Sequence, residues 1–282
     1  MLPYLARRAR AVTLARARAF HATAMERLSS TAEPVITIDL LRGVSAHPLK
    51  HHAASAERVI SMVPHASSSV LVGDRDRHRF EMIIVSEYSC GATAHASLVN
   101  MPPTALDASS SHATLFATVS PAFASLPTLK AGDVPPPLSA SLSGRQASDV
   151  PFLAEGNAHE ESWAALLSDP EESMLAFNLL RTPDPEAYKA YSAHFSPLPE
   201  RYGMRFVVAG ALDPDPAHSV LRGAVDPEVA SNDLLALVYF PSSGGFLDAW
   251  SDPDLVHDAY PLRTAMLPNG FRHIWLRCHE AC

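Results

Sequence analysis

The sequence has few cysteines and none of the short motifs that mark the common catalytic sites. Its three cysteines, Cys90, Cys278 and Cys282, form no CxxC pair, which excludes a disulfide framework and a zinc knuckle. The patterns GxGxxG, GxxxxGKS/T, HExxH and GxSxG do not occur, so the usual nucleotide, zinc-protease and serine-hydrolase motifs are missing. His51 and His52 are adjacent, so on a helix they would point in different directions and could not bind one metal ion. We therefore expect no metal site and no cofactor.

Positive charge and long apolar runs are also scarce. The formal net charge of −8 argues against nucleic-acid binding, because contacts to phosphates need a basic surface. No apolar run approaches the roughly 20 residues of a membrane span. Apolar residues nevertheless make up 47% of the 282 residues and charged residues only 18%. This composition predicts one large folded domain or two of ordinary size.

The first 30 residues differ in composition from the rest of the chain. Their first acidic residue is Glu26, and a possible helix would be basic on one side and apolar on the other. Arg18 and Phe20, followed by Thr23, resemble the pattern of matrix processing. The segment contains six arginines: Arg7, Arg8, Arg10, Arg16, Arg18 and Arg27. We predict a mitochondrial transit peptide and a matrix location; the alternative is a disordered basic tail without an address.

Two segments about half the chain apart are similar to each other. VITIDLLR (35–42) and MLAFNLLR (174–181) are apolar runs with one acid or amide at the same place, Asp39 or Asn178, and both end in Leu-Leu-Arg. Such runs are typical of strands that are covered on both faces. Residues then recur at helical spacing in both halves, as Leu49, His52, Ala56, Val59 and Val63 in the first and as Tyr188, Tyr191, Phe195, Leu198 and Tyr202 in the second. The pattern predicts a helix after each first strand.

A second pair of segments, 81–99 and 233–251, aligns without gaps. Each consists of an apolar run, a small-residue turn and a helical stretch, and each half ends in one more apolar run. The predicted order in each half is strand, helix, strand, strand, helix, strand. The two middle strands are joined by a polar hairpin turn at 74–78 in the first half and by a longer flap or extra hairpin at 212–232 in the second.

Prolines interrupt the first helix of the second half. Pro197 and Pro199 lie within its stripe, so we expect the helix to kink or break near Phe195 and to end at Gly203. The residues Ser242 to Gly245 follow a strand, and we interpret them as a helix N-cap and not as a nucleophile site.

These patterns divide the chain into four regions. They are a disordered transit peptide (1–30), a first, diverged repeat (31–120), a linker rich in Pro, Ser and Ala (121–160), and a second repeat (161–282) with its core at 174–278.

Several ordered motifs of the second repeat resemble domain-of-unknown-function family 1330, of the dimeric α/β-barrel superfamily. They are NLLR (178–181), DPEAYKAY (184–191), PLPERYGMRFVVAG (197–210) and the segment 235–266. The first half matches only through the internal repeat. The resemblance implies an α+β fold of two ferredoxin-like βαββαβ units. Their antiparallel sheets would pack into an intramolecular pseudo-dimer, since each sheet has an apolar face to cover; further oligomerisation stays open.

The candidate ligand-pocket residues all lie in the second half: Asn178, Tyr188, Tyr191, Tyr239, Trp250, His257 and Arg263. Asn178 either contacts a ligand or hydrogen-bonds neighbouring backbone, and Asp39 either faces a polar cavity or is a surface acid. The tyrosines are either pocket walls or plain core. Arg263 either holds a ligand carboxylate or forms a surface ion pair.

Two functions fit these residues. One is a cofactor-independent enzyme, or a binder of a small apolar or aromatic ligand, with its pocket in the second repeat. The other is a non-catalytic mitochondrial interaction or scaffolding protein. Small haem-degrading members of the superfamily combine an asparagine, a tryptophan and a histidine, but the motif that would assign those roles here is missing. No catalytic residue can therefore be named, and the fold is predicted more firmly than any reaction.

Overall fold

The computed structural model describes twelve stretches of the chain. They are residues 32–42, 56–64, 70–72, 80–99, 111–119, 164, 168–169, 171–181, 185–212, 220–222, 233–266 and 271–277. The predicted transit peptide, the linker and the turn at 74–78 lie outside them. Among the described residues, none of the helices has the length and hydropathy that a bilayer crossing requires. The chain forms two compact units, which we describe separately.

Unit 1 is a sheet with one described helix. Its strands follow the order β4-β1-β5-β8, and β1 pairs antiparallel with β5 so that Asp39 faces Thr114 across the ladder. The elements are β1 (Val35–Arg42), most of β4 (Met82–Tyr88), α2 (Gly91–Val99), β5 (Ser111–Val119) and β8 (Val220–Arg222). Seven of the eight residues of β1 are buried, so this strand is covered on both faces, as its apolar sequence predicts.

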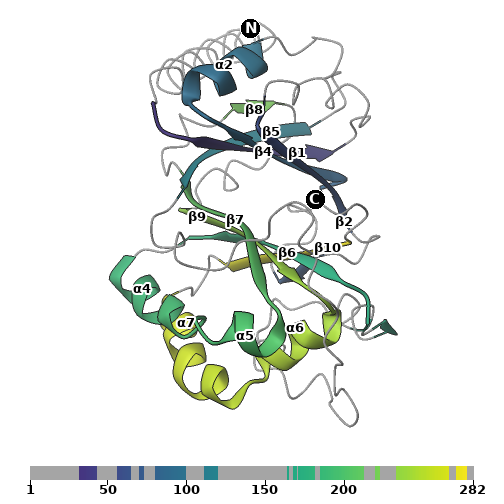
Figure 1. Ribbon diagram of the computed structural model, residues 1–282, viewed down its shortest axis with the longest axis vertical. Helices are drawn as coiled ribbons and strands as arrows, with labels where there is room; N and C mark the ends of the chain where they lie inside the picture. Colours follow the sequence, from purple (N-terminus) through teal and green to yellow (C-terminus); the bar gives the residue numbers. More distant parts are fainter. Residues whose placement is uncertain are drawn as a thin grey trace, which may run out of the picture. The chain divides into compact units, whose positions relative to one another are not determined.

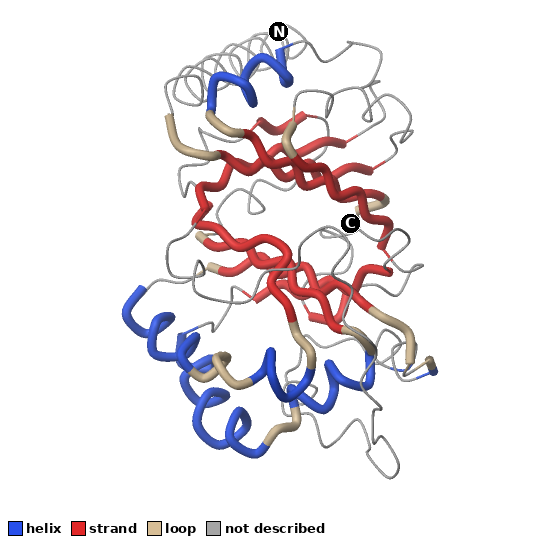
Figure 2. Tube along the Cα trace, viewed as in Figure 1, coloured by secondary structure: helices blue, strands red, loops and turns tan. Residues whose placement is uncertain are grey.

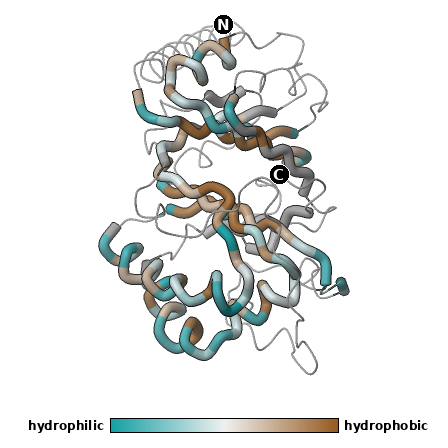
Figure 3. The backbone as a smooth tube through the Cα atoms, in the orientation of Figure 1, coloured by the Kyte–Doolittle hydropathy of each residue, from teal (hydrophilic) through white to brown (hydrophobic). Residues whose placement is uncertain are grey.

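Unit 2 is an antiparallel sheet with helices on one face (Figure 1, Figure 2). Its strand order is β2-β10-β6-β9-β7, and β3 pairs with β10. The strands are β2 (Arg58–Pro64), β3 (Val70–Val72), β6 (Met174–Leu180), β7 (Arg205–Leu212), β9 (Leu234–Phe240) and β10 (Phe271–Arg277). The helices are α4 (Pro185–Ala193), α5 (Leu198–Tyr202), α6 (Ser243–Trp250), the π-helical turn η9 (Leu255–Ala259) and α7 (Tyr260–Met266). The hydrophobic colour in Figure 3 is concentrated on the strands, where the core lies.

Each unit contains a short strand that comes from the other half of the sequence. β3 lies between two strands of the first half, yet it pairs with β10, the last strand of the second half. β8 lies within the predicted flap of the second half, yet it pairs with β5, the last strand of the first half. The flap therefore does contain an extra strand, but that strand belongs to unit 1.

The helix break predicted near Phe195 is confirmed. α4 ends at Ala193 and α5 begins at Leu198, so Pro197 directly precedes α5 and Pro199 is its second residue. Gly203 ends α5 in the left-handed conformation with φ 67°, which glycine adopts without the steric cost that a Cβ would add.

The N-cap prediction is also confirmed. The Ser242 side chain accepts a hydrogen bond from the Gly245 backbone N–H at 2.9 Å and so caps α6. This bond satisfies one of the amides that the first turn of a helix leaves without a partner.

The helix predicted through Val59 and Val63 in the first half is wrong. These residues lie on strand β2; the earlier part of the predicted helix lies outside the described residues. The run RVISMVP is rich in β-branched residues, which favour a strand. In the second half the positions aligned with Val59 and Val63 lie on helix α5, before strand β7, so the ungapped alignment pairs strand residues with helix residues.

Candidate functional site

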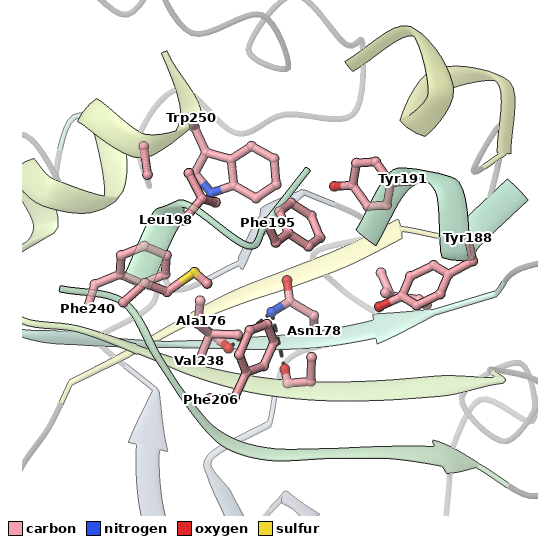
Figure 4. A pocket seen from close by; sticks show the side chains of 14 residues that line it. Ala176, Asn178, Tyr188, Tyr191, Phe195, Leu198, Phe206, Val238, Phe240 and Trp250 are labelled. Atoms are coloured by element: carbon pink, nitrogen blue, oxygen red, sulfur yellow. Dashed lines mark hydrogen bonds between the residues drawn. The ribbon is translucent and has the colours of Figure 1, made fainter. Parts of the chain in front are cut away.

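A cavity of about 50 Å³ lies in unit 2 between the sheet and its helices (Figure 4). Its lining residues come from three strands, three helices and the loops beside them. They are Ala176, Asn178, Leu180, Tyr188, Tyr191, Phe195, Leu198, Met204, Phe206, Ala236, Val238, Phe240, Ala249 and Trp250. None of them is charged, so the cavity favours neutral and largely apolar contents.

The floor of the cavity follows from strand alternation. Every second residue of β6 faces it, from Ala176 through Asn178 to Leu180, and the same holds for Ala236, Val238 and Phe240 of β9. Successive side chains of a strand point to opposite faces, and β6 pairs with β9 so that Asn178 lies opposite Ala236. The two strands therefore present one continuous face to the helices.

Aromatic rings form the wall and the mouth. Tyr191 packs edge-on against Phe195 with ring centroids 4.7 Å apart, and Phe195 packs edge-on against Trp250 at 6.2 Å. Phe195 and Trp250 are partly exposed, whereas the other lining residues are buried. These two rings are therefore the mouth of the cavity.

Polar groups are few at this site. The Asn178 amide nitrogen donates to the backbone oxygens of Ala176 and Ala236, both at 3.1 Å. The predicted alternative in which Asn178 hydrogen-bonds neighbouring backbone is thus confirmed for its amide nitrogen. Its amide oxygen faces the cavity (Figure 4). Burial, and secondly the neighbouring Tyr191, raise the pKa of the Tyr188 hydroxyl, so Tyr188 stays protonated and cannot act as a base near neutral pH.

Four of the seven candidate residues are brought together at this cavity, namely Asn178, Tyr188, Tyr191 and Trp250. Tyr239, His257 and Arg263 do not line it, which corrects their assignment to the same pocket. Tyr239 is buried, but it alternates with Val238 and Phe240 and faces the other side of the sheet. His257 is exposed on the π-helical turn.

Arg263 also departs from its predicted surroundings. It is 2% exposed, so it is not the surface ion-pair residue of one alternative. Its guanidinium lies 5.7 Å from the centre of the Tyr260 ring, a cation–π distance. Both residues lie on α7, and neither lines the cavity.

The apolar part of the lining does not stand out in the sequence. Phe206, Phe240 and Met204 are ordinary core residues by sequence, and only the polar and aromatic outliers were singled out. The period-two pattern of 236, 238 and 240 opposite 176 and 178 was available as a signal. To recognise these residues as one face, one must know how β6 pairs with β9, and the sequence alone does not show this pairing.

An ionic clasp joins α5 to the loop after α6. Arg201 donates to Asp252 at 2.9 Å and to Asp254 at 3.0 Å, and the Tyr202 hydroxyl donates to Asp252 at 2.5 Å. Burial acts to raise the pKa of Asp252, but the hydrogen bonds from Tyr202 and Arg201 outweigh it and lower that pKa. The clasp fixes the position of α5, whose Leu198 lines the cavity.

The same face of unit 1 has a different chemistry. Five positions can be compared between the units: the third and fifth residues of β6 or β1, the fifth and seventh of β9 or β4, and the seventh of α6 or α2. In unit 2 the residues at these positions line the cavity: Ala176, Asn178, Val238, Phe240 and Ala249. Unit 1 has polar residues there, all of them buried: Thr37, Asp39, Ser86, Tyr88 and Ser97. We call these five residues, together with Thr114, the polar cluster.

Asp39 is the centre of the polar cluster. It is 8% exposed and accepts a hydrogen bond from the Thr114 hydroxyl at 2.6 Å, so the surface-acid reading of Asp39 is wrong. Tyr88 donates to the Ser97 hydroxyl at 3.2 Å. Burial raises the pKa of Tyr88, and the negative charge of Asp39 acts in the same direction.

Comparison with known proteins leaves the family open. No protein-family model matches the chain, and no curated protein matches it. The resemblance to family 1330 therefore stays a prediction.

Solved structures with some similarity include three proteins. A protein of unknown function from Rhodopseudomonas palustris is 24% identical, with a TM-score of 0.35, over 44% of this chain and 96% of its own. An anthrone oxidase-like protein is 12% identical, with a TM-score of 0.39, over 90% of this chain and 97% of its own. Chlorite dismutase from Candidatus Nitrospira defluvii, as a point mutant, is 8% identical, with a TM-score of 0.36, over 89% of this chain and 94% of its own.

Proposed function

We propose that unit 2 binds a small, neutral, largely apolar molecule in the cavity between its sheet and helices. The observation that carries this proposal is the uncharged, aromatic-lined cavity with a partly exposed mouth at Phe195 and Trp250. Apolar clefts with a few convergent polar groups are the usual form of small-molecule sites. Binding is favoured over catalysis, because no lining residue is a base or nucleophile poised to react near neutral pH.

The size of the cavity limits the ligand. Its volume of about 50 Å³ is smaller than the roughly 150 Å³ of a cavity that holds benzene. A molecule with a ring therefore enters only when Phe195 or Trp250 swings outward. The position of both rings at the mouth makes this movement possible without disturbing the buried floor.

The proposal is tested by thermal unfolding with toluene as the probe. Toluene raises the unfolding midpoint of the wild-type protein in a concentration-dependent way, because a ligand that binds only the folded state stabilises it. Ala249→Leu fills the cavity from α6 and abolishes the toluene shift, even though overpacking itself costs about 1–3 kcal/mol.

Val99→Leu is the matched control, because it adds bulk at a residue that is 60% exposed. This variant keeps the full toluene shift. Equal toluene shifts in wild type and Ala249→Leu would place the binding elsewhere. The absence of any shift with toluene and other small apolar probes, together with a stable protein partner, would support the scaffolding alternative.

We further propose that the two halves are diverged copies that form an intramolecular pseudo-dimer of the dimeric α/β-barrel type. The five corresponding positions around Asp39 and Asn178 support this, and so does the reciprocal pairing of β3 with β10 and β8 with β5. The arginine-rich composition of residues 1–30 supports import into mitochondria. A fusion of these residues to a fluorescent reporter tests the import proposal, which fails if the reporter stays in the cytosol.

A further inference from the structure

The orientation of the Asn178 amide is fixed by the backbone. Its nitrogen has two hydrogens, and it donates to the backbone oxygens of Ala176 and Ala236, both at 3.1 Å. Rotating the amide by half a turn would direct its oxygen at these two carbonyl oxygens and break both bonds. Because an amide has one donor side and one acceptor side, the acceptor side must face away from the strands.

The amide oxygen consequently faces the cavity. Figure 4 shows it turned away from the sheet, toward the ring of Phe195. The Asn178 residue is only 8% exposed, and among the described residues no hydrogen bond reaches this oxygen. A buried acceptor that lacks a donor costs free energy, which a donor from water or from a ligand recovers.

The surroundings specify the kind of donor. No charged side chain lines the cavity, so a cationic donor would lose its hydration with no carboxylate to compensate it. An anion would meet the negative end of the Asn178 carbonyl dipole. Apolar and aromatic side chains surround the oxygen on the helix side, so the remainder of the ligand has to be apolar.

We infer that the ligand of this site is a neutral, mostly apolar molecule with one hydroxyl or N–H group, which donates its hydrogen to the amide oxygen of Asn178. Simple phenols, aromatic amines and small alcohols belong to this class. The inference rests on the proposed function and deepens it. A phenol has the required donor at one edge of an apolar ring, and toluene has the same shape without the donor.

The test compares phenol with toluene on the wild-type full chain, by thermal unfolding over a series of probe concentrations. A net hydrogen bond between neutral groups gives phenol an affinity about three- to tenfold higher than that of toluene. Aniline, which donates through nitrogen, shows a preference over toluene in the same direction. Equal affinities of phenol and toluene would overturn the inference and leave the proposed function standing. Failure of every probe to bind would overturn both.

The variant Asn178→Leu assigns the preference to this residue. Leucine has a similar size and no acceptor, so phenol loses its advantage while toluene still binds. A preference for phenol that persists in Asn178→Leu would show that another oxygen accepts the hydrogen, and the inference would be wrong.

Trp250→Phe is the matched control, because it changes the mouth and keeps the acceptor. It alters the affinities of phenol and toluene by the same factor. The wild-type comparison needs no variant, so the inference stays falsifiable even if Asn178→Leu does not fold.

Discussion

At five corresponding positions of their strands and helices, the two units have side chains of opposite polarity. In unit 2 the residues at these positions line an apolar cavity with a single amide, Asn178. In unit 1 the corresponding residues form the buried polar cluster around Asp39. A buried polar group has to be satisfied in either setting. In unit 2 the Asn178 amide nitrogen bonds to the backbone of its own sheet, and in unit 1 the Asp39 carboxylate accepts a bond from the Thr114 hydroxyl.

The difference has a consequence for what each face can bind. The apolar face leaves space and the acceptor oxygen of Asn178, which suits a small ligand. Two hydrogen bonds form a small network within the polar cluster, from Thr114 to Asp39 and from Tyr88 to Ser97, whereas the buried Thr37 hydroxyl has no partner among the described residues. Such networks specify one arrangement of a core. The comparison therefore favours unit 2 as the place of the proposed ligand site and gives the polar cluster a structural role.

The largest expected effect concerns the apolar side of the comparison. Phe246 of α6 is fully buried and packs edge-on against Phe240 at 5.0 Å. Phe246→Ala should destabilise the protein by about 3–5 kcal/mol, because it leaves a cavity in addition to the lost transfer free energy. Urea unfolding measures the loss. The position that corresponds to Phe246 in α2 is already an alanine, Ala94. A loss below about 1 kcal/mol would show that Phe246 contributes little to the core of unit 2.

The second prediction tests the polar cluster. Thr114→Val removes the hydroxyl that donates to Asp39 at 2.6 Å, and hydrogen bonds to charged groups contribute about 1.5–3 kcal/mol. Urea unfolding should show a loss of that size. Thr118→Val is the matched control on the same strand, since Thr118 is exposed and its substitution should change stability by less than about 0.5 kcal/mol. Similar values for the two variants would contradict the role of the cluster.

A third, smaller effect concerns Tyr88 and Ser97. Their hydroxyls are joined by a bond of 3.2 Å between two buried side chains. A double-mutant cycle with Tyr88→Phe and Ser97→Ala isolates this bond from the other effects of each substitution. The expected coupling is about 0.5–1.5 kcal/mol. Strictly additive effects of the two substitutions would show that the bond contributes nothing.

The smallest expected effect is a change with pH in the ionic clasp of unit 2. Burial, then the bond to Asp252, raise the pKa of Tyr202 to about 12, whereas a tyrosine in the unfolded chain releases its proton near pH 10. Between these values the folded state holds more protons than the unfolded state, so stability falls as the pH rises. Tyr202→Phe should therefore lose less stability between about pH 10 and pH 12, as measured by urea unfolding at each pH. If the free energy of unfolding of Tyr202→Phe falls with pH as steeply as that of the wild type, Tyr202 is not the cause of the fall.

Much of the fold could be predicted from sequence, because strand and helix signals are local. The runs at 35–42 and 174–181 are mostly apolar, and both form strands. Pro197, Pro199 and Gly203 act within one or two residues of themselves, so the helix break was predictable. The helix through Val59 failed because helical spacing and strand alternation coincide at some positions in a short apolar segment.

The candidate site was harder to predict, since it depends on pairing between distant strands. Asn178 stood out as the one amide in an apolar strand, and Tyr191 and Trp250 as outliers in size and polarity. Tyr239 looked equally suitable but lies on the other face of β9, and a shift of one residue in register reverses the face of every side chain. The polar cluster was missed because Thr37, Ser86 and Ser97 are small residues that seldom mark a site by themselves.

The most direct test of ligand binding in unit 2 is the NMR signal of the Met204 methyl group. Met204 lines the cavity, whereas Met174 is fully buried in the same core without lining it. In protein labelled at the methionine methyl groups and assigned with Met204→Leu, added toluene should shift the Met204 signal, because an aromatic ring bound nearby changes its magnetic environment. The Met174 signal should move much less. A Met204 signal that does not respond at saturating toluene, or equal shifts at both methionines, would contradict the account.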